Sequence, residues 1–243
     1  MIPIASDHAW RGVADCRHCS IRQSALFAKL TEEDFSHVHA PIDNRTVPKG
    51  QALYQAGEPA TGVFTVRSGL IKLSCVTADG RQRILRVHKP GDLIGLEALT
   101  TKRYDSDATA VMDTSLCRIP TEVIHTLSTE SPRMREALFS KLHQTLREAD
   151  EWLSSVNFGT ARQRTAHLVL KMRKKDAPTE VTLFSRDDMG SMMDIKMETA
   201  SREVSALVKT GILQPLDRIG REYRLLDEAA LQTIVGETAC VLR

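Results

Sequence analysis

Residues 185–213 read SRDDMGSMMDIKMETASREVSALVKTGIL, and they carry the clearest structural signal in the chain. Ser185 with Asp188 three residues on is typical of a helix N-terminus, so we expect a short helix through the methionines that follow. Asp194-Ile195 predicts a tight turn, and a longer helix is expected from Lys196 onward. Two helices joined by so short a turn form a helix-turn-helix, whose second helix can enter the major groove of DNA.

The expected second helix carries polar chemistry on one face. Glu198, Ser201 and Arg202 are spaced i, i+3 and i+4, so they share that face. Arginine can donate two hydrogen bonds to guanine, and glutamate can accept one from the amino group of cytosine. The alternative is a solvated face with an internal Glu198–Arg202 ion pair. The opposite face is apolar and is expected in the core: Val204, Leu207 and Val208.

A hairpin is predicted just beyond this helix. Gly211-Ile212-Leu213 ends the helix, and Leu216 to Leu225 is typical of two strands that turn at Asp217-Arg218-Ile219-Gly220. A hairpin beside a reading helix is a wing, and arginines on a wing can contact phosphates. The arginines expected there are Arg218, Arg221 and Arg224. This context favours DNA reading over the ion-pair alternative.

The region from about residue 46 to residue 120 predicts a small antiparallel roll or barrel. Short apolar runs, such as Ala52-Leu53-Tyr54 and Leu70-Ile71-Lys72-Leu73, are separated at regular intervals by turns that contain glycine. Strands that alternate with tight turns in this way are typical of small all-β domains.

A heptad repeat follows in the helical region beyond Thr121. A predicted dimerisation seam consists of residues spaced alternately four and three apart: Leu138, Leu142, Thr145, Ala149, Trp152 and Val156. A second apolar row, which consists of Phe139, Leu146 and Leu153, lies one position along. A helix packed on its own domain fits the periodicity equally well. A long helix between two domains favours a parallel coiled coil that joins two subunits.

With these segments the chain resembles the Crp/Fnr superfamily of transcription regulators over nearly its whole length. The glycine turns KGQALYQAGE at 49–58, RSGLIK at 67–72 and PGDLIG at 90–95 carry the resemblance in the roll. Glu198-Thr199-Ala200-Ser201-Arg202 matches the E-x-x-S-R form typical of the fumarate-and-nitrate-reduction (Fnr) branch. The resemblance implies an α+β fold with four parts: an N-terminal cysteine-containing arm (1–30), a cyclic-nucleotide-binding-like β-roll that senses a signal (31–130), a long dimerisation helix (131–158) and a C-terminal winged helix-turn-helix (159–243).

By resemblance, the chain forms a homodimer, binds a TTGA-type palindrome in double-stranded DNA and contacts RNA polymerase. The implied roles place Arg202 on guanine, Glu198 on cytosine of the opposite strand and Ser201 near a thymine. The other expected DNA contacts are Lys196, Thr199, Arg218 and Arg221. An enzyme is not expected, because the sequence shows no Ser/His/Asp set, P-loop or metalloprotease spacing. The one Cys-x-x-Cys pair precedes a roll instead of opening a helix in a βαβ unit.

The resemblance also implies a signal that the roll and arm detect. The Fnr branch holds a [4Fe–4S] cluster with four cysteines, and Cys16, Cys19 and Cys117 match three of those positions. Ala25 stands at the fourth, so a cluster would be labile, with one iron open to water or to a substitute such as Asp15, His18 or His37. A thiol switch among the three cysteines is a competing interpretation. Inherited, unligated thiols in a small-molecule-responsive or constitutive regulator are another.

Cyclic AMP is not favoured as the effector. Nucleotide-binding members of the superfamily hold the ligand phosphate with an adjacent Arg-Ser or Arg-Thr pair, and here Tyr104-Asp105-Ser106-Asp107 occupies that stretch. Two aspartates at this place would repel an anion.

Composition sets the remaining limits. A hydrophobic fraction of 42% and a charged fraction of 26% are those of a soluble globular protein, and no stretch of about 20 apolar residues could span a membrane. The first ten residues lack a basic region followed by an apolar run, so a cytoplasmic protein is expected. Five cysteines, an odd number, argue against a disulfide framework. The net charge of +2 does not by itself indicate a nucleic-acid partner.

Overall fold

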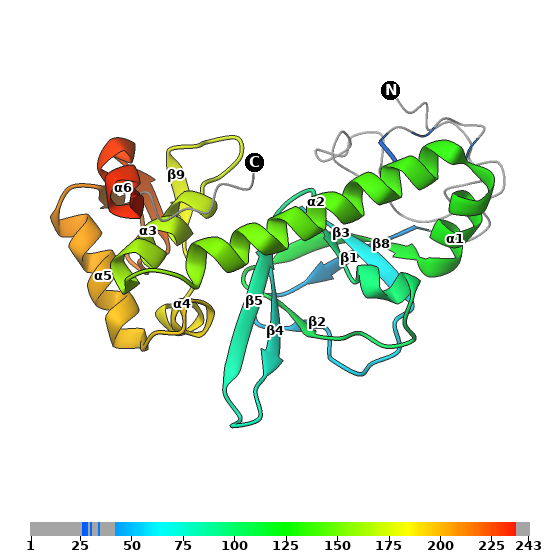
Figure 1. The fold of residues 1–243 in the computed structure, drawn as a ribbon, viewed down its shortest axis with the longest axis horizontal. Helices are drawn as coiled ribbons and strands as arrows, with labels where there is room; N and C mark the ends of the chain where they lie inside the picture. The colour runs from blue at the N-terminus through cyan, green and yellow to red at the C-terminus, as the bar shows by residue number, and fades with distance from the viewer. Residues whose placement is uncertain (1–25, 29, 31–33, 35–41, 237–243) are drawn as a thin grey trace. The chain divides into compact units, whose positions relative to one another are not determined.

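The computed structural model describes residues 26–28, 30, 34 and 42–236. The chain divides into two compact units, one formed by residues 1–75 with 85–148 and the other by residues 76–84 with 149–243. Strands β1 to β8 come first along the chain, and the helices α3 to α6 come last (Figure 1). This order confirms the predicted α+β fold.

Two four-stranded sheets make the roll, with strand orders β1-β8-β3-β6 and β2-β7-β4-β5. The strands are β1 (Asp43–Val47), β2 (Ala52–Tyr54), β3 (Gly62–Ser68), β4 (Ile71–Val76), β5 (Gln82–His88), β6 (Leu93–Ile94), β7 (Asp107–Ala110) and β8 (Thr114–Pro120). Val66 of β3 and Leu116 of β8 are fully buried in the hydrophobic core of the roll. The predicted glycine turns therefore lie between strands that share one core.

Gly69 shows why these turns contain glycine. Its φ is +88°, and a Cβ at this position would lie 2.6 Å from the carbonyl oxygen of Asp113. Any side chain would therefore collide with the backbone entering β8. The RSGLIK turn is thus a steric requirement of the β3–β4 connection.

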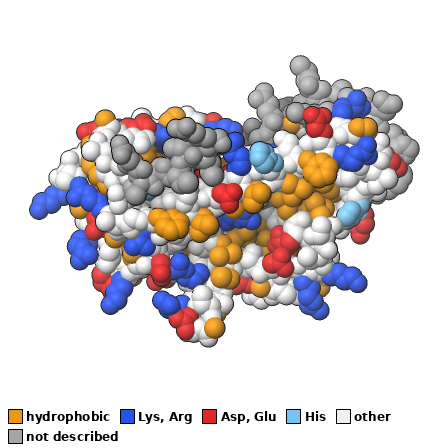
Figure 2. Space-filling model, viewed as in Figure 1, with side chains coloured by type: hydrophobic (Ala, Val, Ile, Leu, Met, Phe, Trp, Pro, Cys, Tyr) orange, Lys and Arg blue, Asp and Glu red, His pale blue; other side chains and the backbone are white. Residues whose placement is uncertain are grey.

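The roll leads through a short 3₁₀ helix, η2 (Leu96–Leu99), and helix α1 (Thr121–Glu130) to the long helix α2 (Pro132–Val156). Near its start α2 buries Met134 and Ala137. Farther along, large hydrophobic side chains of α2 are exposed, and Figure 2 shows hydrophobic side chains gathered over this helix. Within the described part of the chain, no helix combines the length and the apolar run that spanning a membrane requires.

The second unit contains the elements α3 (Ala161–Lys171), β9 (Glu180–Thr182), α4 (Arg186–Met193), α5 (Met197–Lys209), β10 (Leu213–Pro215), β11 (Glu222–Leu225) and α6 (Glu228–Val235). Its small sheet has the order β10-β11-β9. Helix α3 ends at Lys171, because the chain turns at Met172 and pairs Arg173 with Val181. The first strand of the hairpin begins earlier than expected, since Leu213 pairs with Leu225.

Candidate nucleic-acid interface

Helices α4 and α5 form the predicted pair. The hydroxyl of Ser185 accepts a hydrogen bond from the backbone N–H of Asp188 at 3.1 Å and so caps α4. At the other end Asp194 has a left-handed backbone, with φ 52° and ψ 50°. The N–H of Ile195 then donates to the carbonyl of Gly190 at 3.1 Å. The turn between the helices is therefore held by the backbone itself.

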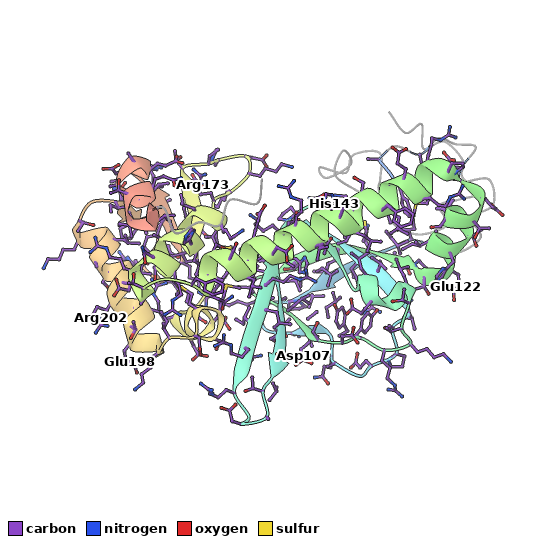
Figure 3. All side chains as sticks on the ribbon, viewed as in Figure 1. Asp107, Glu122, His143, Arg173, Glu198 and Arg202 are labelled. Carbon is purple, nitrogen blue, oxygen red and sulfur yellow. The ribbon has the colours of Figure 1, made fainter. Side chains whose placement is uncertain are left out.

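Helix α5 divides into a buried face and an exposed one. Ala200, Val204 and Leu207 are buried, whereas Val208, expected in the core, is only half-buried. Glu198, Ser201 and Arg202 are all exposed, and the first and last of these are labelled on α5 in Figure 3. Of the other expected contacts on this helix, Lys196 is exposed at the N-cap and Thr199 is half-buried. The polar face is open to a partner.

The internal ion pair is absent from the described residues. Arg202 Nε lies 4.0 Å from Glu203 Oε1 instead of pairing with Glu198, and the Arg202 side chain is 74% exposed. An exposed contact at that distance restrains the guanidinium little. Arg202 is therefore available for a bidentate contact.

The wing is a turn between β10 and β11 that one carboxylate organises. Asp217 Oδ1 accepts the backbone N–H groups of Gly220 at 2.8 Å and Arg221 at 3.0 Å. Burial tends to raise the pKa of Asp217, but the backbone N–H groups that donate to its carboxylate outweigh burial and hold that pKa below its usual value. Arg218 is exposed and Arg221 is half-buried in the turn, and Arg224 is exposed on β11.

Sequence reasoning missed two residues beside this turn, Arg186 and Tyr223. Arg186 Nη2 donates to the Tyr223 hydroxyl at 2.6 Å and to the carbonyl of Gly220 at 3.1 Å. The two residues are 37 positions apart, so no local pattern links them. Only the pairing of β11 with its neighbours brings them together.

The comparisons with known proteins agree with this geometry. A family model of the cyclic nucleotide-binding domain matches residues 44–131, and one of the Crp-like helix-turn-helix domain matches residues 163–234. The two matches occur in the order that the fold requires. The chain belongs to the Crp/Fnr superfamily.

Relatives in this superfamily are transcription regulators. The transcriptional activator protein anr of Pseudomonas aeruginosa is 28% identical over 230 residues, which cover 92% of this chain and 93% of that protein. The fumarate and nitrate reduction regulatory protein of Vibrio cholerae is 27% identical over 228 residues, or 91% of this chain and 90% of that protein. The structure of FixK2 from Bradyrhizobium japonicum superposes with a TM-score of 0.72 at 26% identity, and covers 80% of this chain and 98% of that one. This chain is thus a Crp/Fnr transcription regulator.

The residues of the expected dimerisation seam differ in their exposure: some are buried within the single chain, and others are not. Trp152 and Val156 are only 7% and 1% exposed within the single chain, and Leu138 is half-buried against the roll core. Lys171 Nζ lies 5.1 Å from the centre of the Trp152 ring and 3.3 Å from Glu151 Oε2. Thr145 and Ala149 are half-buried. The apolar side chains that α2 leaves exposed are instead Phe139 (69%), Leu142 (38%), Leu146 (60%) and Leu153 (58%).

Two basic residues just beyond the end of α3, Arg173 and Lys174, are paired within the unit. Arg173 Nη1 lies 2.8 Å from Glu228 Oε1. Lys174 Nζ lies 2.9 Å from carboxylate oxygens of both Glu180 and Glu222, and these hydrogen bonds raise the pKa of Lys174. Because carboxylates neutralise them, these cations are poor candidates for phosphate contacts.

Most of the residues expected to detect the signal lie outside the part of the chain that the structure describes. Cys16, Cys19 and Ala25, with Asp15, His18 and His37, lie outside the described residues. Cys117 is half-buried on β8, without a disulfide, and its Sγ lies 3.7 Å from Asn44 Oδ1. Among the described residues, no three metal-ligand side chains gather at one place.

The stretch expected to replace the nucleotide-binding pair begins with a buried tyrosine, Tyr104. Tyr104 stacks on Tyr54 with ring centres 3.7 Å apart, and its hydroxyl donates to the carbonyl of Gly62 at 2.8 Å. Asp107 accepts the backbone N–H of Ala56 at 2.8 Å. Tyr104 and Asp107 therefore stabilise the roll through contacts with other parts of it.

Asp194 provides a test of the turn between α4 and α5. We expect Asp194→Gly to be more stable than Asp194→Ala by about 1 kcal/mol, because glycine adopts positive φ without the steric cost of a Cβ. Both variants lose the same carboxylate, so their difference isolates the backbone. Urea denaturation followed by circular dichroism measures it, and an alanine variant at least as stable as the glycine variant would contradict the left-handed turn.

Proposed function

We propose that this regulator reads a palindrome of TTGA-type half-sites as a homodimer, with α5 in the major groove. The observation that carries the proposal is the exposed face of α5, on which Glu198, Ser201 and Arg202 stand together at the spacing of the Fnr branch. In this interpretation Arg202 binds guanine, Glu198 accepts from cytosine of the opposite strand and Ser201 lies near a thymine. Contact with RNA polymerase follows from the family resemblance.

The remaining DNA contacts position the protein without reading sequence. Lys196 and Thr199 lie at the start of α5, where the helix dipole also favours a phosphate. Arg218 and Arg221 flank the tip of the wing and would bind the backbone beside the half-site. In this arrangement the exposed face of α5 reads the bases, and the residues at the start of α5 and in the wing bind the phosphates.

Replacement of Arg202 tests the reading assignment. Arg202→Ala should lose about 1–3 kcal/mol of preference for the guanine of TTGA, because a bidentate pair supplies discrimination of that size. Fluorescence anisotropy with duplexes that carry each base at this position measures the preference. Arg173→Ala is the matched control, since Arg173 pairs with Glu228 and lies well away from Arg202 in Figure 3. An Arg202→Ala protein that still selects guanine as the wild type does would refute the assignment.

We propose a dimer seam along the exposed row of α2. Phe139, Leu142, Leu146 and Leu153 are separated by steps of three, four and seven residues, which is heptad spacing. Exposed leucines and a phenylalanine in one row on a soluble helix indicate a surface that a partner covers. A two-fold axis along α2 would match a palindrome, whose half-sites lie about one helical turn apart.

Charges placed in this row should separate the subunits. Phe139→Glu with Leu146→Glu is expected to give a monomer in sedimentation velocity at micromolar concentration, because buried like charges would face each other across the seam. Ser140→Glu, at an exposed polar position outside this row, should leave the dimer intact. Persistence of the dimer in the double variant would show that the subunits meet elsewhere.

We propose that the signal is redox or oxygen, detected through Cys16, Cys19 and Cys117. The support is the match of these residues to three of the four cluster positions, together with a Cys117 side chain that is half-buried and not sealed in the core. Cyclic AMP is not proposed, because Asp105 and Asp107 stand in the stretch that by resemblance would bind its phosphate, and they would repel that anion. A bound [4Fe–4S] cluster would supply the oxygen-sensitive chemistry.

Iron content tests the sensor. After anaerobic reconstitution we expect iron in the wild type, with faster bleaching in air than in Ala25→Cys, because the added thiolate would complete the ligand set. Bound iron and absorbance measure both quantities. If the wild type binds no iron and Cys16→Ser with Cys117→Ser leaves DNA binding unchanged, both the cluster and the thiol switch are excluded.

A further inference from the structure

The wing turn is held on one side by Asp217, and its other side faces the start of α4. Gly220 has a φ of +72°, and a Cβ there would lie 3.2 Å from the Tyr223 hydroxyl. The backbone of the segment before α4 runs beside the turn as well, since the N–H of Leu183 donates to the carbonyl of Arg221 at 2.7 Å. The wing turn therefore lies between the carboxylate of Asp217 and the N-terminus of α4.

Three groups close a triangle at this junction. Arg186 Nη2 donates to the Gly220 carbonyl at 3.1 Å and to the Tyr223 hydroxyl at 2.6 Å. The Tyr223 hydroxyl in turn donates to the same carbonyl at 3.1 Å. Tyr223 is buried and Arg186 is half-buried, so water competes little for these bonds.

The acceptors that hold Arg186 are neutral. Its other guanidinium nitrogen, Nη1, lies 3.3 Å from the Met189 sulfur. Within the described residues no ion pair joins Arg186 to a carboxylate. The guanidinium thus ties two elements together without losing its charge to a carboxylate.

We propose that Arg186 is a positioning residue that fixes the wing, through Gly220 and Tyr223, so that Arg218 reaches the DNA backbone when α5 is in the groove. Since α4 is joined to α5 by a backbone-bonded turn, a wing tied to the first residue of α4 keeps a fixed register with the reading helix. The proposal rests on the DNA-reading function proposed above. It adds a connection between the two parts of that surface.

The salt dependence of DNA binding tests this connection. The slope of log K against log[salt] falls in magnitude by about 0.9 for each phosphate that the protein no longer neutralises. Tyr223→Phe removes no charge and keeps the buried ring, yet it should lower the slope by about 1.8, or about 0.9 for each of the two subunits, because Arg218 on a loosened wing no longer reaches its phosphate. Arg218→Ala should give the same change, and Tyr223→Phe with Arg218→Ala should give no more than either alone. Arg186→Met provides a second, independent break of the triangle.

The controls separate the alternatives. Tyr104→Phe removes a tyrosine hydroxyl bonded to a carbonyl in the roll and should leave the slope unchanged. If Arg186→Met lowers the slope but Tyr223→Phe does not, Arg186 binds a phosphate directly and the proposal fails. It also fails if the effects of Tyr223→Phe and Arg218→Ala add, or if Tyr223→Phe lowers the melting temperature alone. Each slope is measured on a TTGA palindrome and on a scrambled duplex, so that a wild type without preference between them would refute the reading function and leave the wing test valid.

Discussion

The close approach of α4 to the backbone that enters α5 determines how the reading surface is presented. A Cβ at Gly190 would lie 2.7 Å from the carbonyl oxygen of Ile195, so this position tolerates no side chain. Asp194 has a left-handed backbone, so the chain turns sharply between α4 and α5, and this turn fixes the direction in which α5 starts. Its apolar side, with Ala200 and Val204, is then buried, and the opposite side is left to solvent.

Neighbouring residues also hold the wing beside α5 in place. Arg173 and Lys174 of the same unit are engaged by carboxylates, whereas Arg202 on α5 and Arg218 in the wing are exposed. The wing is held by Asp217 from one side and by Arg186 from the other. A site on elements fixed in this way needs little ordering when it meets DNA.

Much of the fold could be predicted because its signals are local. Glycine turns such as that at Gly69 follow from steric limits on the backbone, and the i, i+3, i+4 spacing on α5 follows from helix geometry alone. The seam on α2 could not be chosen in this way, because two apolar rows lie one residue apart and both fit a heptad. Only the fold shows that the chain itself buries Trp152 and Val156 and leaves Leu142 exposed together with the second row. The Arg186–Tyr223 bond likewise joins residues that no periodicity relates.

A two-fold protein that reads two half-sites must be sensitive to their rotation about the DNA axis. The most direct test compares binding to a TTGA palindrome with binding to the same duplex lengthened between the half-sites by about 5 base pairs, roughly half a helical turn. Binding to the lengthened duplex should fall to the level of a single half-site, because the second α5 then faces away from its groove. Equal affinity for the two duplexes would contradict a symmetric dimer that reads DNA through α5.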